Sequence, residues 1–371
     1  MAEICKYYGK CGGCTSQHIP YKTQLINKKN LLASLLKIKN SEIDLFSANE
    51  FNYRNRMDFV FHEKGLGFRE KDTPNQILDI DQCIIAEQQI NSLLIELRDF
   101  FKEVDHFDFK TYKGTFKYAV IRTPKSDSSI SFVLNSDSFR IEQAIKKIKH
   151  FSKNTTAKKV LVAYTPSNSE LSISKEILVI KGSKFLKENI LNKNFVYSSQ
   201  GFFQNNSKLL EEMHSYCNSL LKQYPTQEAH LLDLYGGVGT FGIINSNLFK
   251  QVFTVENNTE CTESAELNTK NNNCKNIKAI TLDAAKINKL NLEKIKPLFV
   301  ILDPPRSGMH QKTINHLNQL LPEVIIYISC NPQQLGKDIP RFRKYKIKSV
   351  ALFDFFPQTF HSEVIAELVK I

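Results

Sequence analysis

The spacing of hydrophobic positions along the chain changes near residue 194. Before it, apolar and polar residues alternate in short runs separated by turn residues, which is typical of strands and hairpins. After it, apolar runs of about five residues alternate with segments of helical spacing, which indicates a parallel sheet covered by helices. We therefore expect two domains. Residues 1–193 form a mainly β domain of the α+β class, and residues 194–371 form an α/β domain.

The same pattern predicts the individual elements. Apolar residues at helical spacing predict a helix over 23–36, and this helix, near 23–37, is a candidate to pack on the second domain. Further helices are predicted over 86–101, 141–151 and 208–221. The predicted strands of the first domain are 57–61, 66–68, 116–121 and 130–134. Those of the second domain are 231–235, 251–255, 277–282, 298–302 and 324–328.

Length and charge narrow the class of protein. The chain has 371 residues, which suits two domains, and its 42% hydrophobic content suits well-buried cores. Its 50 Lys and Arg against 38 Asp and Glu give a net charge of +12. That charge favours a polyanionic partner, because basic groups bind phosphates. A bias of the genome toward Lys codons is an alternative explanation of the positive charge, and the Lys- and Asn-rich segment 269–278 is typical of such a bias.

The sequence contains no evident membrane or targeting segment. No run approaches the roughly 18 apolar residues of a transmembrane helix, and the N-terminus lacks the apolar core of a signal peptide. We therefore expect a cytoplasmic protein with no membrane partner. Eight Cys in that reducing compartment argue for metal binding or catalysis rather than for disulfides.

A glycine-rich turn follows the predicted strand 231–235. Gly237, Gly239 and Gly242 match the spacing G-x-G-x-x-G, which lets a ligand approach backbone amides at the start of a helix. The second domain is therefore expected to be Rossmann-like. The motif alone also suits a nicotinamide-dependent oxidoreductase.

Acidic residues end the next three predicted strands. Glu256 is positioned to bind ribose hydroxyls, and Asp283 is a plausible partner for an adenine amine. Asp303 begins the sequence Asp-Pro-Pro-Arg at the end of the fourth strand. Such a turn is a mark of S-adenosylmethionine-dependent methyltransferases that act on bases or amides. This turn favours a methyltransferase over the oxidoreductase.

A thiol ends the fifth predicted strand of this domain. Cys330 lies in Ser-Cys-Asn-Pro directly after the apolar run 324–328, where open α/β sheets place their ligands. A free Cys is most often a buried hydrophobe, but the Asn-Pro turn favours a nucleophile. Near the C-terminus, Glu363 is a candidate base, and His361 is its rival.

Six stretches in this order resemble the RNA uridine-C5 methyltransferase family, which makes 5-methyluridine. They are residues 53–56, 203–205, 233–242, 303–306, 329–332 and 356–363. The resemblance implies that S-adenosylmethionine is the methyl donor, that Cys330 is the nucleophile and that Glu363 is the base. It also implies that the cofactor is bound by Gln204, Tyr235, Glu256 and Asp303. From the glycine turn and the strand ends we add Gly237, Gly239 and Asp283.

The chain departs from the family pattern at two places. Relatives often have Cys at the position of Gly236, and we expect that this position needs only a small residue. The N-terminal TRAM β-barrel is also missing, because the cysteine cluster begins at residue 5. This resembles the subgroup that methylates 23S ribosomal RNA, with the T-loop of transfer RNA as the alternative. We expect the protein to act as a monomer.

Uracil chemistry calls for these residue types independently of the resemblance. Carbon 5 of uracil is too weak a nucleophile to take a methyl group until a thiolate adds at carbon 6 and creates an enolate. The thiolate is the active form of Cys330, and the positive charge of Arg306 is expected to favour it. A carboxylate must then remove the C5 proton so that the thiolate can leave.

The N-terminal half carries a second set of cysteines. Cys5, Cys11 and Cys14 are clustered, and Cys83 is a distant fourth. Their spacing leaves zinc and an iron–sulfur cluster equally open. The resemblance implies a [4Fe-4S] cluster with a structural role.

Aromatic and basic residues suggest where RNA binds. Tyr53, Arg54 and Arg56 combine stacking and phosphate-binding groups, and so do the residues Lys113, Phe116, Lys117 and Tyr118. An ordinary exposed strand face explains both groups equally well. A non-catalytic RNA-binding protein with a metal site is the remaining alternative, and the pair Cys330 and Glu363 argues against it.

Overall fold

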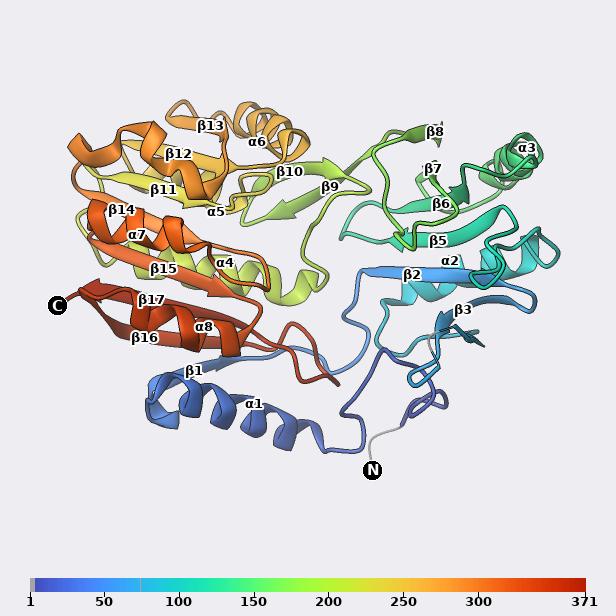
Figure 1. Cartoon of the computed structure of the whole chain (residues 1–371), viewed down its shortest axis with the longest axis horizontal. Helices are drawn as coiled ribbons and strands as arrows, with labels where there is room; N and C mark the ends of the chain where they lie inside the picture. Colours follow the sequence, from blue (N-terminus) through green and yellow to red (C-terminus); the bar gives the residue numbers. More distant parts are fainter. Residues whose placement is uncertain (1–3, 74) are drawn as a thin grey trace. The chain divides into compact units, whose positions relative to one another are not determined.

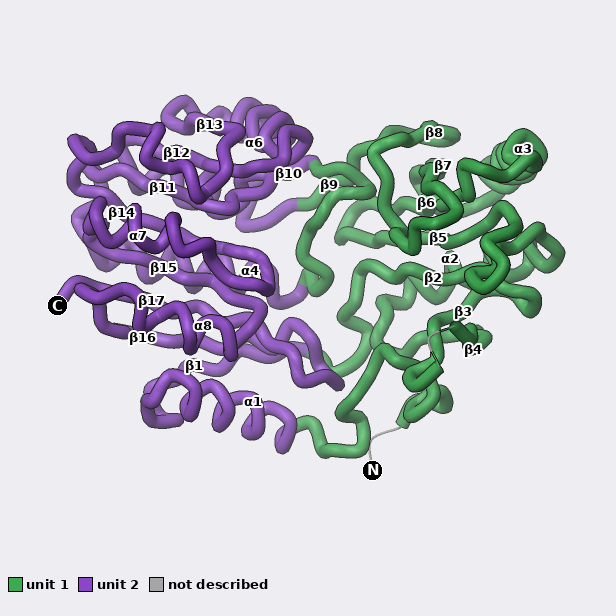
Figure 2. Tube along the Cα trace, in the orientation of Figure 1, with its two compact units in different colours: residues 1–21, 49–188, 197–207 green, residues 22–48, 189–196, 208–371 purple. Residues whose placement is uncertain are grey.

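A computed structural model describes residues 4–73 and 75–371, which fold into two compact units (Figure 2). Unit 1 contains the N-terminal segment through Tyr21, Asn49–Glu188 and Tyr197–Ser207. Unit 2 contains Lys22–Ala48, Asn189–Val196 and Lys208–Ile371. Each unit is thus built from three separate stretches of the sequence. The division into independently folding domains at residue 193 stays a prediction.

Unit 1 is built on a mainly antiparallel sheet (Figure 1). Among the described residues its order is β4-β3-β2-β5-β6-β7-β8, and β6 and β7 are the parallel pair. The chain passes from β6 to β7 through a helix, as parallel neighbours require. The elements are β2 (Arg56–His62), β3 (Gly65–Arg69), β4 (Ile77–Asp79), α2 (Gln88–Phe100), β5 (Phe116–Arg122), β6 (Ser129–Asn135), α3 (Ile141–Ser152), β7 (Lys159–Thr165) and β8 (Ile177–Lys181).

The core of unit 1 is aromatic. Rings from three strands and two helix ends pack together at centroid distances between 5.0 and 6.5 Å, in mostly tilted or edge-on pairs. These rings belong to Phe61, Phe101, Phe116, Phe132 and Phe151, all buried. Large rings in such pairs supply much of the apolar surface that a core buries.

Unit 2 is built on a larger, mainly parallel sheet. Its order, for the part of the chain that the structure describes, is β1-β16-β17-β15-β14-β11-β12-β13. The strands are β1 (Ile43–Phe46), β11 (His230–Leu234), β12 (Gln251–Glu256), β13 (Ile277–Thr281), β14 (Leu298–Leu302), β15 (Val324–Ser329), β16 (Tyr345–Phe353) and β17 (Glu363–Lys370). The helices are α1 (Tyr21–Leu36), α4 (Ser207–Leu221), α5 (Thr240–Asn245), α6 (Thr259–Asn271), α7 (Gln311–Leu320) and α8 (Pro332–Asp338). The chain also forms the pair β9 (Phe185–Ile190) and β10 (Lys193–Ser198).

The central strands of unit 2 are buried on both faces. Every residue of β14 and β15 is buried, which is why these strands are continuous apolar runs in the sequence. Strand β17 is antiparallel to both of its neighbours and lies between β15 and β16. This strand therefore joins the C-terminal end of the chain to the centre of the sheet.

Helix α1 belongs to unit 2, and its buried face is partly polar. The residues that face inward are Gln24, Lys28, Leu32 and Ala33, whereas Ile26 and Leu31, two of the apolar residues whose spacing predicts the helix, are exposed. Leu32 and Ala33 pack in the core of the large sheet together with Ile43 of β1. Gln24 and Lys28 form hydrogen bonds with residues of the C-terminal segment 354–358.

The predicted helices and strands are confirmed, with bounds that differ by one or two residues. The α/β fold of the C-terminal part and the mainly β fold of the N-terminal part are confirmed as well. Among the described helices, none is both long enough and apolar enough to cross a membrane.

The packing of α1 predicts different outcomes for two adjacent leucines. Replacing the buried Leu32 by Ala should lower the free energy of unfolding by about 2–5 kcal/mol, because it leaves a cavity in the core of unit 2. Leu31→Ala, at a side chain that is 45% exposed, should change that free energy by less than about 0.5 kcal/mol. Urea denaturation followed by circular dichroism measures both. Equal losses would contradict the orientation of α1.

Candidate active site

The carboxyl ends of neighbouring strands in unit 2 carry the predicted chemistry. Leu234 of β11 pairs with Leu302 of β14, and β12 ends at Glu256 on the other side of β11. The backbone N–H of Asp303, which follows β14, donates to the carbonyl of Leu234 at 3.3 Å. Asp303, the glycine turn after β11 and Glu256 therefore follow one another along a single edge of the sheet.

Cys330 and Glu363 meet at the same edge. Ser329, the last residue of β15, pairs with Val364 of β17. The antiparallel register therefore places the next residues, Cys330 and Glu363, opposite each other. Glu363 is only 3% exposed, and Cys330 is half-buried. The structure thus brings together the predicted nucleophile and the predicted base.

The Asn-Pro turn after Cys330 fixes the end of β15. Asn331 caps α8 by accepting a hydrogen bond from the backbone N–H of Gln334 (3.3 Å), and Pro332 is the first residue of the helix. The side-chain amide of Asn331 also donates to the carbonyl of Arg306 at 2.9 Å. This bond ties the turn of the thiol to the turn that follows Asp303.

Burial sets the charge of the two groups. Burial, followed by the nearby carboxyls of Glu363 and Asp303, raises the pKa of the Cys330 thiol to about 11, and Arg306 opposes this rise. Burial likewise raises the pKa of Glu363 well above its usual range, with Asp303 adding to the effect and Arg306 opposing it. The expected help from Arg306 is therefore present but smaller than the effect of burial.

His361, the rival base, lies at the surface two residues before Glu363. Its backbone N–H donates to the hydroxyl of Thr359 at 3.2 Å. Burial lowers the pKa of His361, and Arg306 and Lys28 lower it further. Glu363 is the group at the strand end opposite Cys330, so geometry favours Glu363 over His361 as the partner of the thiol.

The glycine turn has the backbone conformation that its sequence predicts. Gly237 and Gly239 have φ values of +54° and +84°, in the left-handed region. Tyr235 is left-handed as well, at +61°, which is strained for a residue with a side chain. A side chain on Gly237 would have no atom within 4 Å, so this part of the turn borders open space.

Glu256 holds the turn from the neighbouring strand. One carboxylate oxygen accepts a hydrogen bond from the backbone N–H of Gly237 at 3.2 Å, and the other accepts one from Asn258 at 2.9 Å. Asp283, one strand further along, caps the 3₁₀ helix Ala284–Leu290 by accepting from the N–H of Ala285 at 2.9 Å. Both carboxylates thus lie at the edge where the sequence placed them.

Gly236 is closely packed, which agrees with the expected need for a small residue. A Cβ atom at Gly236 would come within 2.4 Å of the Thr254 methyl carbon and 2.9 Å of a carboxylate oxygen of Asp233. A larger residue at this position would therefore require Thr254 of the neighbouring strand or Asp233 to shift.

Asp233 is a buried acid that the sequence reasoning did not assign. One of its oxygens accepts hydrogen bonds from the N–H of Gly242 (3.0 Å) and the hydroxyl of Thr254 (3.3 Å), so it ties α5 to the sheet. Burial raises its pKa to about 7. Burial raises the pKa of Asp303 to about 7 too, followed by the effect of Glu256. The sequence does carry a signal for this role, because Asp233 is the acidic residue within the apolar run 231–234.

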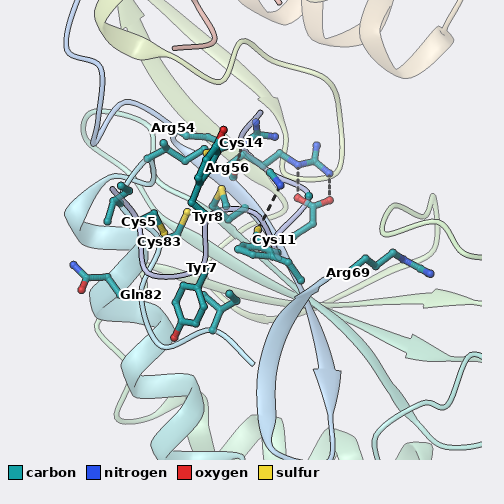
Figure 3. A pocket seen from close by; sticks show the side chains of 18 of the residues that line it. Cys5, Tyr7, Tyr8, Cys11, Cys14, Arg54, Arg56, Arg69, Gln82 and Cys83 are labelled. Carbon is teal, nitrogen blue, oxygen red and sulfur yellow. Dashed lines mark hydrogen bonds and ion pairs between the residues drawn. The ribbon is translucent and has the colours of Figure 1, made fainter. Parts of the chain in front are cut away.

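The remaining predicted residues lie in unit 1. Gln204 is half-buried, and its backbone carbonyl accepts a hydrogen bond from the side-chain amide of Asn55 at 3.3 Å. Cys5, Cys11, Cys14 and Cys83 line one cavity of about 610 Å³ (Figure 3). The roles predicted for these five residues stay predictions.

The thiols around this cavity influence one another. Burial raises the pKa of Cys14 to about 11 and that of Cys83 to about 12, and neighbouring thiols of the set add to both shifts. Arg54 and Arg56 line the same cavity, and Arg56 is paired with Asp58 at 2.9 Å. Within residues 4–73 and 75–371, no three His, Cys, Asp or Glu side chains are already arranged to hold a metal ion.

Several residues considered for RNA binding are buried. Tyr53, Phe116, Lys117 and Tyr118 are at most 5% exposed, so their rings and charge do not face solvent. The Lys117 ammonium donates to the carbonyls of Pro166 and Ser169. The suggestion that these four residues stack on bases or bind phosphates is therefore wrong. Lys113 is exposed, and Arg54 and Arg56 are half-buried.

The comparison with solved structures places this fold among S-adenosylmethionine-dependent methyltransferases. The structure of the Pyrococcus abyssi tRNA (uracil-54, C5)-methyltransferase, in complex with S-adenosyl-L-homocysteine, matches with a TM-score of 0.81 and 26% sequence identity. The match covers 99% of this chain and 88% of that one.

Sequence comparison defines the family. Residues 20–370 match the family described as tRNA (uracil-5-)-methyltransferase. An uncharacterised RNA methyltransferase of Caldanaerobacter subterraneus is 31% identical over 99% of this chain and 84% of the relative. The tRNA (uracil(54)-C(5))-methyltransferase of Pyrococcus horikoshii is 30% identical over 98% of this chain and 85% of the relative. The chain belongs to this family.

The burial of Asp303 predicts a pH-dependent effect of its substitution. Its carboxyl ionises near pH 4 in the unfolded chain but near pH 7 when folded, so ionisation destabilises the folded protein as pH rises through this window. Asp303→Asn removes that cost. The free energy of unfolding of the variant, minus that of the original protein, should therefore be about 3 kcal/mol larger at pH 8 than at pH 5.

Urea denaturation of the ligand-free protein at both pH values measures the difference. Glu293→Gln, at an exposed side chain of the same unit, is the control and should show no such change. A stability difference for Asp303→Asn that is the same at pH 5 and pH 8 would contradict the raised pKa.

Proposed function

We propose that this protein transfers a methyl group from S-adenosylmethionine to carbon 5 of a uridine in RNA. Cys330 acts as the nucleophile and Glu363 as the general base. The observation that carries the proposal is the register of β15 and β17, which sets the thiol opposite a buried carboxyl at the end of the sheet. Membership in the family supports the reaction type.

Cys330 begins the reaction as a nucleophile. Its sulfur bonds to carbon 6 of the uracil, and the electrons of the C5–C6 double bond move to form an enolate at O4. Carbon 5 is then nucleophilic enough to bond to the incoming methyl carbon. When bound, S-adenosylmethionine would supply that carbon from its sulfonium, and the electrons of the broken sulfur–methyl bond would remain on the sulfur as a neutral thioether.

Glu363 completes the reaction as a base. It takes the proton from carbon 5, the C–H electrons restore the C5–C6 double bond, and the thiolate of Cys330 leaves. A carboxyl with a raised pKa is a stronger base than an ordinary one, which suits the removal of a proton from carbon. A bound sulfonium cation would favour the ionised forms of both Glu363 and Cys330.

The edge of the sheet offers a site that fits the methyl donor. The open space beside Gly237 leaves room for a ligand against the turn. We assign the ribose hydroxyls to Glu256 and the adenine amine to Asp283, as acceptors of their hydrogens. We assign Tyr235 and Asp303 to the same ligand.

The proposal also concerns which RNA is the substrate. The resemblance implied 23S ribosomal RNA, but the two Pyrococcus relatives described above are methyltransferases of uracil 54 in transfer RNA. That observation favours transfer RNA for this chain. Mapping 5-methyluridine in both RNAs of a strain that lacks the gene decides between them, because only the true target loses the modification.

We also propose that the four cysteines of unit 1 hold a [4Fe-4S] cluster. The donor chemistry fits, because Cys5, Cys11, Cys14 and Cys83 border one cavity and four thiolates are the usual ligands of such a cluster. The remaining side chains around the cavity include Tyr7 and Phe68, which would shield it. The proposed role is structural, joining the N-terminal segment to the sheet of unit 1.

Substitution of the two proposed catalytic residues should block different steps. Cys330→Ala should form no covalent bond to RNA and should lose methyl transfer. Glu363→Gln should still add to carbon 6 and accept the methyl group, but the C5 proton then has no acceptor. A covalent protein–RNA adduct should therefore accumulate, as a slow band on a denaturing gel that requires both S-adenosylmethionine and RNA.

Single-stranded or loop RNA should trap better than duplex RNA, because the base must leave its stack to reach the thiol. Normal turnover by Glu363→Gln, together with trapping by His361→Ala, would assign the base to His361 instead. Full turnover by Cys330→Ala would remove Cys330 from the mechanism.

The cluster proposal predicts a coloured protein. Material prepared without oxygen should be brown and contain about four iron atoms per chain. Cys83→Ser should bleach it and lower its melting temperature, because metal binding is linked to folding. Cys261→Ser, on α6 of unit 2, is the matched control and should keep the colour. A colourless protein with one zinc ion per chain would overturn the cluster in favour of zinc.

A further inference from the structure

Helix α1 directs two buried polar side chains at the segment that leads to Glu363. Gln24 and Lys28 are 3% and 7% exposed, and their spacing of four residues puts them on one face of the helix. The segment 354–362 follows β16 and ends where β17 begins with Glu363. All of these residues belong to unit 2, in which α1 runs beside the edge strand β1 (Figure 1).

Lys28 holds the beginning of this segment. Its ammonium donates to a carboxylate oxygen of Asp354 at 2.5 Å and to the backbone carbonyl of Phe356 at 3.1 Å. Asp354 is fully buried, and its backbone N–H donates to the carbonyl of Phe46 in β1. The ion pair therefore links α1 to the point where the chain leaves the sheet.

Gln24 holds the middle of the segment through two hydrogen bonds to one residue. Its amide nitrogen donates to the side-chain oxygen of Gln358 at 2.9 Å, and its amide oxygen accepts from the backbone N–H of Gln358 at 3.1 Å. Gln358 has a φ of +65°, a left-handed conformation that is strained for a residue with a side chain. A conformation of this kind persists where its surroundings hold it.

The rest of the segment is tied to these two anchor points. The hydroxyl of Thr359 donates to the carbonyl of Phe356 at 2.8 Å and accepts from the N–H of His361 at 3.2 Å. Glu363 follows two residues later. The position of its carboxyl along the edge of the sheet therefore depends on a chain of contacts that begins on α1.

Stability alone does not explain polar groups at this place. A buried ion pair is weak evidence for stability, because removing two charges from water offsets most of their attraction. Apolar residues at positions 24 and 28 would bury the helix face as well, as Leu32 does one turn further on. Polar side chains differ from apolar ones because their hydrogen bonds are directional, so they fix the position and orientation of the groups that they bind.

From these contacts we propose that Gln24 and Lys28 are positioning residues for the general base. They hold the segment 354–362 so that the carboxylate of Glu363 reaches the C5 proton of the methylated uracil adduct. This inference rests on the proposed function, and it concerns the last step of that reaction alone.

The test separates this step from the earlier ones. Gln24→Met keeps the volume of the side chain and leaves the ion pair of Lys28 intact, but it removes both hydrogen bonds to Gln358. In single-turnover reactions with labelled S-adenosylmethionine and a transcript that the original protein methylates, two rates are measured. They are the transfer of label to RNA and the release of RNA from the covalent adduct.

We expect release to slow by about 10-fold or more in Gln24→Met, because small misplacements of a catalytic group have effects of this size. Transfer of the label should change by less than about twofold. The double variant Lys28→Met/Asp354→Leu, which leaves no unpaired buried charge, should show the same selective effect. Lys22→Met, at an exposed position of α1, is the control and should match the original protein at both rates.

The outcomes are distinguishable. If both rates fall together, or if neither changes, α1 has only a structural role and the inference is overturned. If the original protein forms no adduct and transfers no methyl group to uridine C5 in either transfer or ribosomal RNA, the proposed function fails and the inference fails with it.

Discussion

The pairing of β17 between β15 and β16 is the constraint on which the candidate site depends. Strand β15 has the parallel strand β14 on one side and the antiparallel strand β17 on the other. The antiparallel strand enters from the carboxyl edge of β15, so its first residue, Glu363, lies next to the last turn of β15. Shifting this register by one residue would turn every side chain of β17 to the other face of the sheet. The register is held by eight strand residues of which six are buried.

Acidic groups crowd this edge, and burial governs their charge. Asp233, Asp303 and Glu363 are buried with raised pKa values, and Glu363 and Asp303 in turn raise the pKa of the Cys330 thiol. Without a ligand, the edge therefore favours protonated acids and a protonated thiol. A cationic ligand offsets this crowding, which is why a sulfonium donor suits the site better than a neutral one. The same cation would bring the nucleophile and the base into their active forms together.

The sequence predicts the strands of the parallel sheet well, because buried strands are continuous apolar runs, as in 298–302 and 324–328. It also places Cys330, Asp303 and Glu256 correctly at strand ends. It does not reveal which face of α1 is buried, because Gln24 and Lys28 are inside only by virtue of partners more than 300 residues away. Likewise, the crowding around Gly236 comes from Thr254 on the next strand. Local pattern carries no information about such long-range contacts.

The most direct test of the account is the identity of the residue that bonds to RNA. In a transcript whose target uridine carries fluorine at carbon 5, there is no C5 proton to remove, so the original protein should stall as a covalent adduct. Digestion and mass spectrometry should then find a methylated fluorouridine attached to the peptide that contains Cys330. A nucleotide attached to any other cysteine, or methylation of the RNA with no attached peptide, would contradict the account.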